Sequence, residues 1–173
     1  MRDLRTIAAA CEKDLTDIGI KIGYIDGYEV NSRATGRLGQ CRAVRGRSRH
    51  FRIQITSALL SESIPLDELK NTVYHELLHT CPGCMNHGEE WRRLAGIVNR
   101  AYGMNISRCA SKDEEAEEAV QIMRERRIAT ARYKTECLGC GNICVNQREC
   151  GFTRNPERYL CAKCGDNSWK RIL

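Results

Sequence analysis

This sequence of 173 residues shows neither a membrane-spanning segment nor a secretory signal, and both observations bear on where the protein is located in the cell. No run of apolar residues approaches the ~20 that a membrane-spanning helix needs, so we expect no contact with a membrane interior. The first residues, MRDLRTIAAACEKD, include Asp3 and Arg5, and their apolar stretch is far too short for a secretory signal. We therefore expect a cytoplasmic protein.

Acidic residues are absent between Val30 and Ser61. Without the seven arginines of this stretch, the 28 basic residues of the chain fall to 21, against 22 acidic residues. A concentrated basic surface fits a polyanionic partner such as nucleic acid, and a solubilising polar face on a half-exposed sheet is the alternative. The arginines are Arg33, Arg37, Arg42, Arg45, Arg47, Arg49 and Arg52, and the last five are the candidate nucleic-acid contacts.

Cysteine, in contrast, is abundant, with eleven residues in the chain. An odd number of cysteines without a secretory signal favours metal ligands over disulfides. Two CxxC pairs lie twenty residues apart near the C-terminus, a spacing typical of a structural zinc site. Because about 40 residues bury too little apolar surface alone, we expect zinc to hold this segment together. The predicted ligands are Cys137, Cys140, Cys161 and Cys164, with a short β-hairpin between the two pairs.

Other residues of this C-terminal segment allow two interpretations. Cys144 and Cys150 make no second pair, so we treat them as bystanders rather than ligands. The aromatic residues either stack on bases beside basic side chains or form the small core of the segment. These residues are Phe152, Tyr159 and Trp169, with Arg148, Arg154, Arg158, Lys163 and Lys170.

The pattern of apolar residues predicts an α+β protein, with helices packed on a short antiparallel sheet. In residues 50–56, Phe51, Ile53 and Ile55 alternate with polar residues, which indicates a strand with one buried face. A charged helix over 111–134 is expected to act as a solvated spacer. The other predicted helices cover 3–17, 65–80 and 89–101, and the extended segments cover 20–30 and 37–44.

An HExxH motif lies on the helix predicted over 65–80. On a helix, His75 and His79 are one turn apart on the same face, so both imidazoles can bind one ion. Zinc takes such nitrogen ligands in tetrahedral geometry, and a catalytic site needs a third protein ligand and a water molecule. Glu76 would then take the proton of that water as a general acid/base. The third ligand is either His87, which we favour, or one of the thiols of Cys81 and Cys84.

The sequence resembles the SprT-like zinc metallopeptidases in HELLH, the HGEEW that follows it, and the terminal cysteine pairs. The resemblance implies that His75, His79 and His87 bind a catalytic zinc and that Glu76 is catalytic. It also implies a small zincin-like domain over 1–115, a charged helical linker over 116–134 and a β zinc ribbon over 135–173. The chain would then hold two zinc ions, one catalytic and one structural.

The resemblance further implies how substrate is bound. A peptide would add to the strand over 50–56 as an extra strand, and the substrates would be proteins held on DNA. A monomeric endopeptidase, associated with the nucleoid through DNA, is therefore the leading hypothesis. The alternative is a nucleic-acid-binding zinc protein whose HExxH site is structural or inactive.

Overall fold

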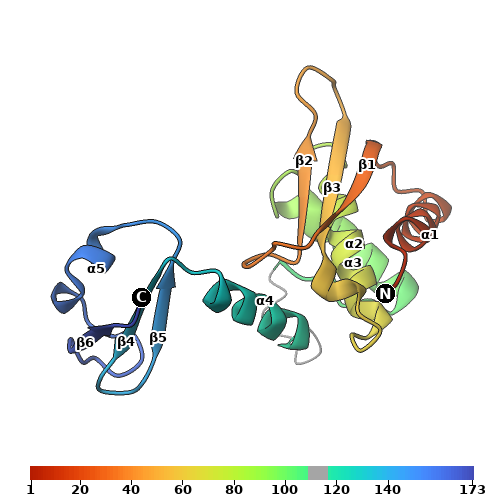
Figure 1. The fold of residues 1–173 in the computed structure, drawn as a ribbon. Helices are drawn as coiled ribbons and strands as arrows, with labels where there is room; N and C mark the ends of the chain where they lie inside the picture. Colours follow the sequence, from red (N-terminus) through yellow and green to blue (C-terminus); the bar gives the residue numbers. More distant parts are fainter. Residues whose placement is uncertain (109–116) are drawn as a thin grey trace. The chain divides into compact units, whose positions relative to one another are not determined.

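A computed structural model describes residues 1–108 and 117–173, and Figure 1 shows its elements. These residues form two compact units, Met1–Met123 and Arg124–Leu173. The predicted α+β class is confirmed, because both units combine helices with a small three-stranded sheet. No helix in the described ranges is long and apolar enough to cross a membrane.

The helices of the N-terminal unit follow the predicted segments closely. The second helix begins at Leu66, one residue after the predicted start. Its N-cap residue, Pro65, makes no side-chain cap hydrogen bond. The helices are α1 (Leu4–Asp17), α2 (Leu66–Leu78), α3 (Glu89–Tyr102) and the first half of α4 (Glu117–Ala129), with a short 3-10 helix η1 (Ser57–Leu60).

The sheet of this unit has the order β1-β3-β2 and is mixed rather than antiparallel. The chain reverses after β1 (Tyr24–Asn31) and again after β2 (Gly39–Ala43), so β3 (His50–Thr56) runs in the direction of β1. Because β3 lies between the other two strands, it pairs in parallel with β1 and antiparallel with β2. The predicted antiparallel sheet is correct only for the β2–β3 pair.

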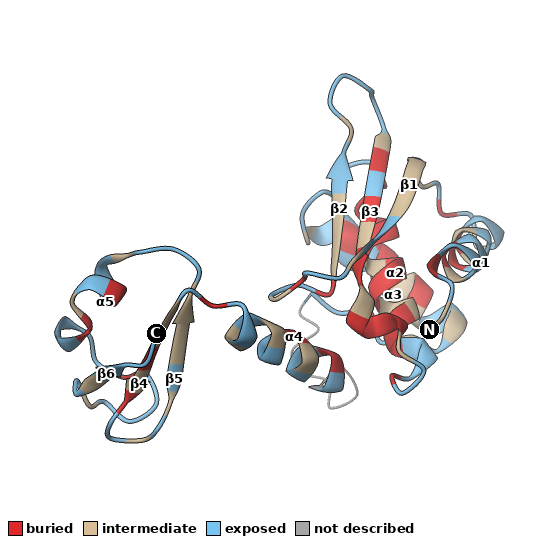
Figure 2. Ribbon diagram, in the orientation of Figure 1, coloured by how far each residue is buried: buried red, intermediate tan, exposed pale blue. Residues whose placement is uncertain are grey.

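Helices α1 and α2 pack on the sheet and bury one of its faces, as the red segments of Figure 2 show. Phe51, Ile53 and Ile55 of β3 are buried, as their alternation predicts, and the polar residues between them face outward. Burial of large aliphatic side chains contributes roughly 1.5–3 kcal/mol each, so this core fixes the position of α2. Helix α1 adds Leu4, Ala8, Cys11 and Leu15, and α2 adds Leu69, Val73, Leu77 and Leu78.

The first half of α4 also joins this core, which corrects the expectation of a wholly solvated spacer. Ala119 and Met123 are buried among the apolar residues of the N-terminal unit. Ser63 donates a hydrogen bond to Glu118 at 2.8 Å. Residues 109–116, the first part of the predicted spacer, lie outside the described ranges.

The C-terminal unit is a three-stranded sheet of order β5-β4-β6 with two short helical segments. The predicted hairpin between the cysteine pairs is wrong. The hairpin instead joins β4 and β5 around the first pair, and β5 is followed by two short helical segments in the interval between the pairs. The elements are β4 (Tyr133–Cys137), β5 (Ile143–Asn146), α5 (Gly151–Arg154), η4 (Pro156–Arg158) and β6 (Trp169–Arg171).

Candidate metal centre

Three histidines meet beside α2 in the N-terminal unit. His75 and His79 lie one turn apart on this helix, and His87 reaches them from the loop that precedes α3. The Nε2 atom of His75 is 3.2 Å from Nε2 of His79 and 2.9 Å from Nε2 of His87. A tetrahedral zinc ion with bonds of ~2.0–2.1 Å separates its nitrogen ligands by about 3.3 Å, so the spacing fits zinc.

The hydrogen bonds of these rings determine which nitrogen atoms are free to bind a metal. His75 Nδ1 donates to the Ser107 carbonyl oxygen at 3.0 Å, and His79 Nδ1 donates to the Cys84 carbonyl oxygen at 2.7 Å. A carbonyl oxygen only accepts, so in the neutral rings the Nε2 atoms carry lone pairs. Two lone pairs that face each other at 3.2 Å repel unless a cation lies between them.

Burial favours the neutral, metal-binding form of two of these rings, His75 and His87. The pKa of His75 is lowered to about 4, mainly by burial and then by its histidine neighbours. Burial also lowers the pKa of His87. Trp91 of α3 is 2% exposed, and its ring centroid lies 4.7 to 5.7 Å from those of all three histidines. The indole ring of Trp91 therefore covers one side of the histidine cluster.

Glu76 is buried beside this cluster, against strand β2. Burial raises the pKa of its carboxyl group to about 7, while the Cys41 backbone amide and the Arg37 charge act in the opposite direction. A Cβ atom at Gly39 would lie 2.6 Å from Oε1 of Glu76. Only glycine at residue 39 allows β2 to approach the carboxylate so closely. This contact was not predictable from the sequence, because no local pattern connects residues 39 and 76.

The loop between His79 and His87 contains a turn with defined geometry. The Cys84 backbone amide donates to the Cys81 carbonyl oxygen at 3.1 Å, and Gly83 has a φ of 74°. Proline at the second position and glycine with positive φ at the third are the features of a type II turn. The turn directs the Cys84 carbonyl oxygen at His79. Among the described residues, the cluster of potential ligand atoms here contains the three histidines and neither thiol.

A second potential metal centre lies in the C-terminal unit. The sulfur atoms of Cys137 and Cys164 are 3.5 Å apart, and those of Cys140 and Cys161 are 3.7 Å apart. A tetrahedral zinc ion with Zn–S bonds of ~2.3 Å separates sulfur atoms by about 3.8 Å. A backbone amide, that of Lys163, is the main cause that lowers the pKa of Cys161 to about 6. The four sulfurs of this cluster are therefore compatible with a zinc ribbon.

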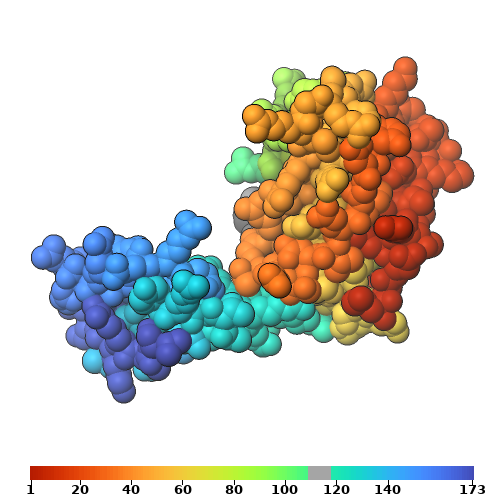
Figure 3. All heavy atoms as spheres, turned by 45° about the horizontal axis from the view of Figure 1, so that its top comes forward, coloured from red at the N-terminus to blue at the C-terminus, as the bar shows by residue number. Residues whose placement is uncertain are grey.

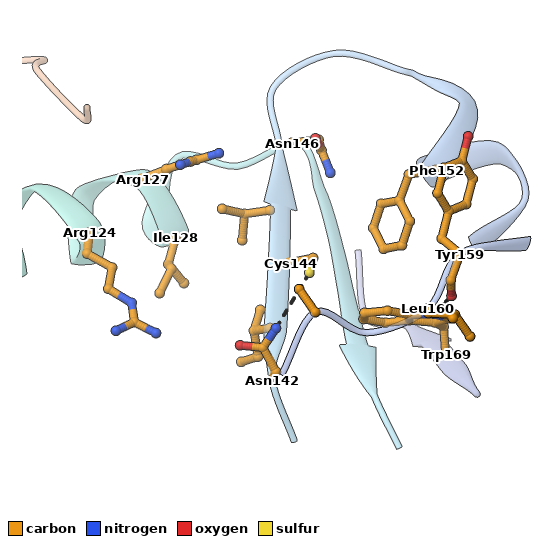
Figure 4. A pocket seen from close by; sticks show the side chains of 13 residues that line it. Arg124, Arg127, Ile128, Asn142, Cys144, Asn146, Phe152, Tyr159, Leu160 and Trp169 are labelled. Carbon is orange, nitrogen blue, oxygen red and sulfur yellow. Dashed lines mark hydrogen bonds between the residues drawn. The ribbon is translucent and has the colours of Figure 1, made fainter. Parts of the chain in front are cut away.

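The two surplus cysteines lie outside this cluster. Cys144 accepts a hydrogen bond from the Asn142 side chain at 3.7 Å, and Cys150 precedes α5 at its N-cap position. Cys144 lines a groove of about 540 Å³ within the C-terminal unit. Figure 4 shows its side chain among the others that line this groove. Phe152 meets the rings of Tyr159 and Trp169 edge to face, and Trp169 donates to the Tyr159 carbonyl oxygen at 2.8 Å. The aromatic residues thus form a packed cluster.

The candidate nucleic-acid contacts lie on the outer face and tip of the β2–β3 hairpin. Arg42 of β2 and Arg52 of β3 are directly opposite each other. Arg47 forms an ion pair with Asp26 at 2.9 Å. All five arginines are exposed: Arg42, Arg45, Arg47, Arg49 and Arg52.

Comparison with known proteins agrees with this geometry. The model of the SprT-like family matches residues 25–110, a range that contains β1 without its first residue, every element from β2 to α3, and the three histidines of the cluster. The chain belongs to the SprT-like family over these residues. The predicted resemblance is therefore confirmed. No curated protein matched the chain.

Proposed function

We propose that this SprT-like protein is a zinc-dependent endopeptidase. The observation that carries the proposal is the convergence of three Nε2 atoms, together with a buried carboxylate at Glu76, the residue that follows His75 in α2. His75, His79 and His87 would hold the catalytic zinc. The four cysteines, Cys137, Cys140, Cys161 and Cys164, would hold a structural zinc in the ribbon.

Zinc, when bound, would supply Lewis acidity toward the scissile carbonyl group and the attacking water. Glu76 would take the proton of that water as general base and donate it to the leaving amine as general acid. A general acid/base works best when its pKa lies near the working pH, and burial raises the pKa of Glu76 to about 7. Gly39 and the Cys41 amide would hold the carboxylate in place.

The edge of the sheet beside Glu76 would bind the substrate. The expectation that a peptide adds to residues 50–56 is wrong, because β3 is the central strand and both of its edges are paired. Among the described strands of this sheet, β1 and β2 each leave one edge unpaired, and the edge of β2 is the one beside Glu76. The Leu38 carbonyl and the Val44 amide bond to β3, so by alternation the groups of Gly39, Cys41 and Ala43 point the other way. Because the Cys41 amide contacts Glu76, a peptide would pair with the other groups of these three residues. A peptide that pairs with this edge would pass Glu76.

Proteins associated with DNA are the proposed substrates. The exposed arginines of the β2–β3 hairpin support this class, because clustered arginines bind phosphate groups and concentrate a polyanion near the centre. Pairing through backbone groups selects weakly for side chains, so attachment to the same nucleic acid would provide much of the selectivity.

A comparison of the wild-type chain with Glu76→Gln tests the proposal. Each protein is incubated with a denatured protein substrate, with and without DNA, and zinc content is measured in parallel. We expect Glu76→Gln to keep its zinc and to lose at least about a hundred-fold in cleavage rate, because general acid/base catalysis typically contributes this much. Equal behaviour of the two zinc-loaded proteins would instead favour the nucleic-acid-binding alternative.

A further inference from the structure

A groove of about 640 Å³ lies where strands β1 and β3 begin, between the chain that leaves α1 and the tip of the β2–β3 hairpin. Neither the candidate metal centre nor the β2 edge contributes to its lining. In Figure 3, the segment around this hairpin forms much of the visible surface of the N-terminal unit. The groove is lined by Thr16, Gly19, Ile20, Lys21, Ile22, Gly23, Tyr24, Ser48, Arg49 and His50.

Two basic side chains border the groove without a carboxylate partner in the described part of the chain. Lys21 and Arg49 are exposed, and no described acidic oxygen lies within 4.0 Å of either cation. Arg49 has a φ of 56°, and it is the sole described residue other than glycine with positive φ. A side chain in this left-handed region is uncommon and such strain clusters at functional sites.

An exposed aromatic ring lies beside these cations. Tyr24 is 66% exposed, and one side of its ring contacts His50 at a centroid distance of 4.7 Å. The His50 ring is fixed in turn, because His50 Nδ1 donates to the Asp26 carboxylate at 2.6 Å. Asp26 also accepts from Arg47 at 2.9 Å, which ties the hairpin tip to β1. Tyr24 therefore presents its other face on a rigid support.

Basic side chains extend from the groove onto the outer face of the sheet. Along β3, His50 and Arg52 point to the same side, and Arg42 lies opposite Arg52. Like charges directly opposite each other on a sheet are destabilising. Glu29 approaches Arg52 at 3.4 Å and offsets this repulsion in part. A bound phosphate would relieve the repulsion further, so a polyanion fits a path from the groove across this face.

We propose that the groove binds one unpaired nucleotide of a single-stranded nucleic acid, with its base on Tyr24 and its phosphate between Lys21 and Arg49. The strand continues over Arg52 and Arg42. A base within a duplex is already stacked on both faces, so the Tyr24 ring selects single-stranded over double-stranded nucleic acid. This inference rests on the nucleic-acid part of the proposed function and names the form of nucleic acid that the chain recognises.

Fluorescence anisotropy of the full-length Glu76→Gln chain with a labelled oligothymidylate of about 15 nucleotides tests the groove. Tyr24→Ala is expected to weaken binding about ten-fold, the scale of one lost base stack, and Tyr24→Phe to retain most of the affinity. Arg49→Asn removes the charge, and asparagine tolerates the left-handed backbone. We expect this variant to lower the slope of log affinity against log salt concentration by about one. Arg5→Ala, an equal loss of charge at the start of α1, is the matched control and should have little effect.

A direct readout separates this groove from any other binding surface on the chain. An oligonucleotide that contains 5-iodouracil is bound and irradiated, and the crosslinked peptide is identified by mass spectrometry. We expect a crosslink at Tyr24 that is lost when unlabelled single strands compete and kept when an unlabelled duplex competes. Circular dichroism of each variant shows whether it is folded.

The outcomes distinguish this inference from the proposed function. Wild-type affinity in both Tyr24→Ala and Arg49→Asn, with the crosslink elsewhere, would overturn the groove while nucleic-acid binding stands. Equal affinity for single strands and duplexes would also overturn it. Failure of the unaltered chain to bind either form would remove the nucleic-acid part of the proposed function. The endopeptidase part would remain, and the comparison of the wild-type chain with Glu76→Gln in cleavage without DNA would test it.

Discussion

Gly39 in β2 lies against the carboxylate of Glu76 in α2, and a Cβ atom at residue 39 would come within 2.6 Å of Oε1 and 2.7 Å of Cγ. Such distances are far below van der Waals contact, so any side chain here displaces either the strand or the carboxylate. One glycine in the sheet thus sets the position of the proposed general acid/base. The relationship also connects the free edge of β2, the proposed peptide site, to the residue that would act on the peptide.

We therefore expect Gly39→Ala to lower kcat/KM for peptide cleavage by roughly a hundred-fold, the cost of a displacement of about 1 Å at a reacting group. Zinc content should stay at the wild-type level, because the three atoms nearest to a Cβ at Gly39 all belong to Glu76 and not to a histidine ligand. Gly36→Ala is the matched control, since a Cβ atom there meets nothing within 4 Å. Unchanged cleavage by Gly39→Ala would show that the position of Glu76 does not limit the reaction.

The buried carboxyl group of Glu76 should make the stability of the metal-free protein depend on pH. Its pKa is raised in the folded state from 4.5 to about 7, so the folded protein binds the proton more tightly than the unfolded chain. Stability from this group is present below the unfolded pKa and is lost as pH rises to about 7 and beyond. The full effect is on the order of 3 kcal/mol.

Glu76→Gln has no charge to bury, so its metal-free form should unfold at a higher temperature than the wild type at about pH 8, and the gap should shrink at about pH 5. Trp91 fluorescence in a Trp169→Phe background follows the N-terminal unit alone, because the chain has two tryptophans, one in each unit. Glu89→Gln, which changes an exposed carboxylate, serves as control. A constant gap between about pH 5 and pH 8 would contradict the burial of an ionisable Glu76.

Local patterns in the sequence were sufficient to predict much of this structure. The spacing of His75 and His79 fixed their common face on α2, and the alternation of Phe51, Ile53 and Ile55 identified the buried face of β3. These predictions succeeded because helix and strand periodicity are properties of neighbouring residues. The placement of His87 beside the other two histidines was favoured from its position ahead of Gly88, and the structure brings the three together.

Contacts between distant segments were not predictable in this way. The order β1-β3-β2 depends on how strands pair across more than twenty residues, and nothing in residues 50–56 indicates that both edges are paired. The same applies to the approach of Gly39 to Glu76 and of Tyr24 to His50, since each joins separate elements. The parallel pairing of β1 with β3 brings Tyr24 beside His50, and no motif marks that pair.

Metal analysis should find two zinc ions per chain, because the described residues include two clusters with zinc spacing. His75→Ala should lose the zinc of the histidine centre and keep that of the ribbon. Cys161→Ser should lose the zinc of the ribbon and keep that of the histidine centre. The histidine centre has three protein ligands and the ribbon has four, so a chelator should remove zinc first from the histidines. Cys144→Ser and Cys150→Ser are matched controls for Cys161→Ser and should keep both ions; loss of zinc from either would make it a ligand.

The turn at Gly83 should affect the zinc affinity of the histidine centre indirectly, through the position of His79. With a φ of 74°, Gly83 holds the turn that aims the Cys84 carbonyl oxygen at His79 Nδ1, 2.7 Å away. Alanine is strained in this conformation, so Gly83→Ala shifts the carbonyl group and leaves the His79 ring without its support. Loss of such a partner typically lowers metal affinity by about 10- to 100-fold.

Competition with a fluorescent zinc chelator measures this loss for the histidine centre, in a chain whose ribbon is already saturated. Gly83→Asn is the matched variant, because asparagine adopts positive φ more readily than alanine, and it should fall between the wild type and Gly83→Ala. That order follows from backbone strain alone. Equal zinc affinity in all three proteins would mean that the Cys84 carbonyl oxygen does not orient His79, and that α2 alone holds the ring in its binding position.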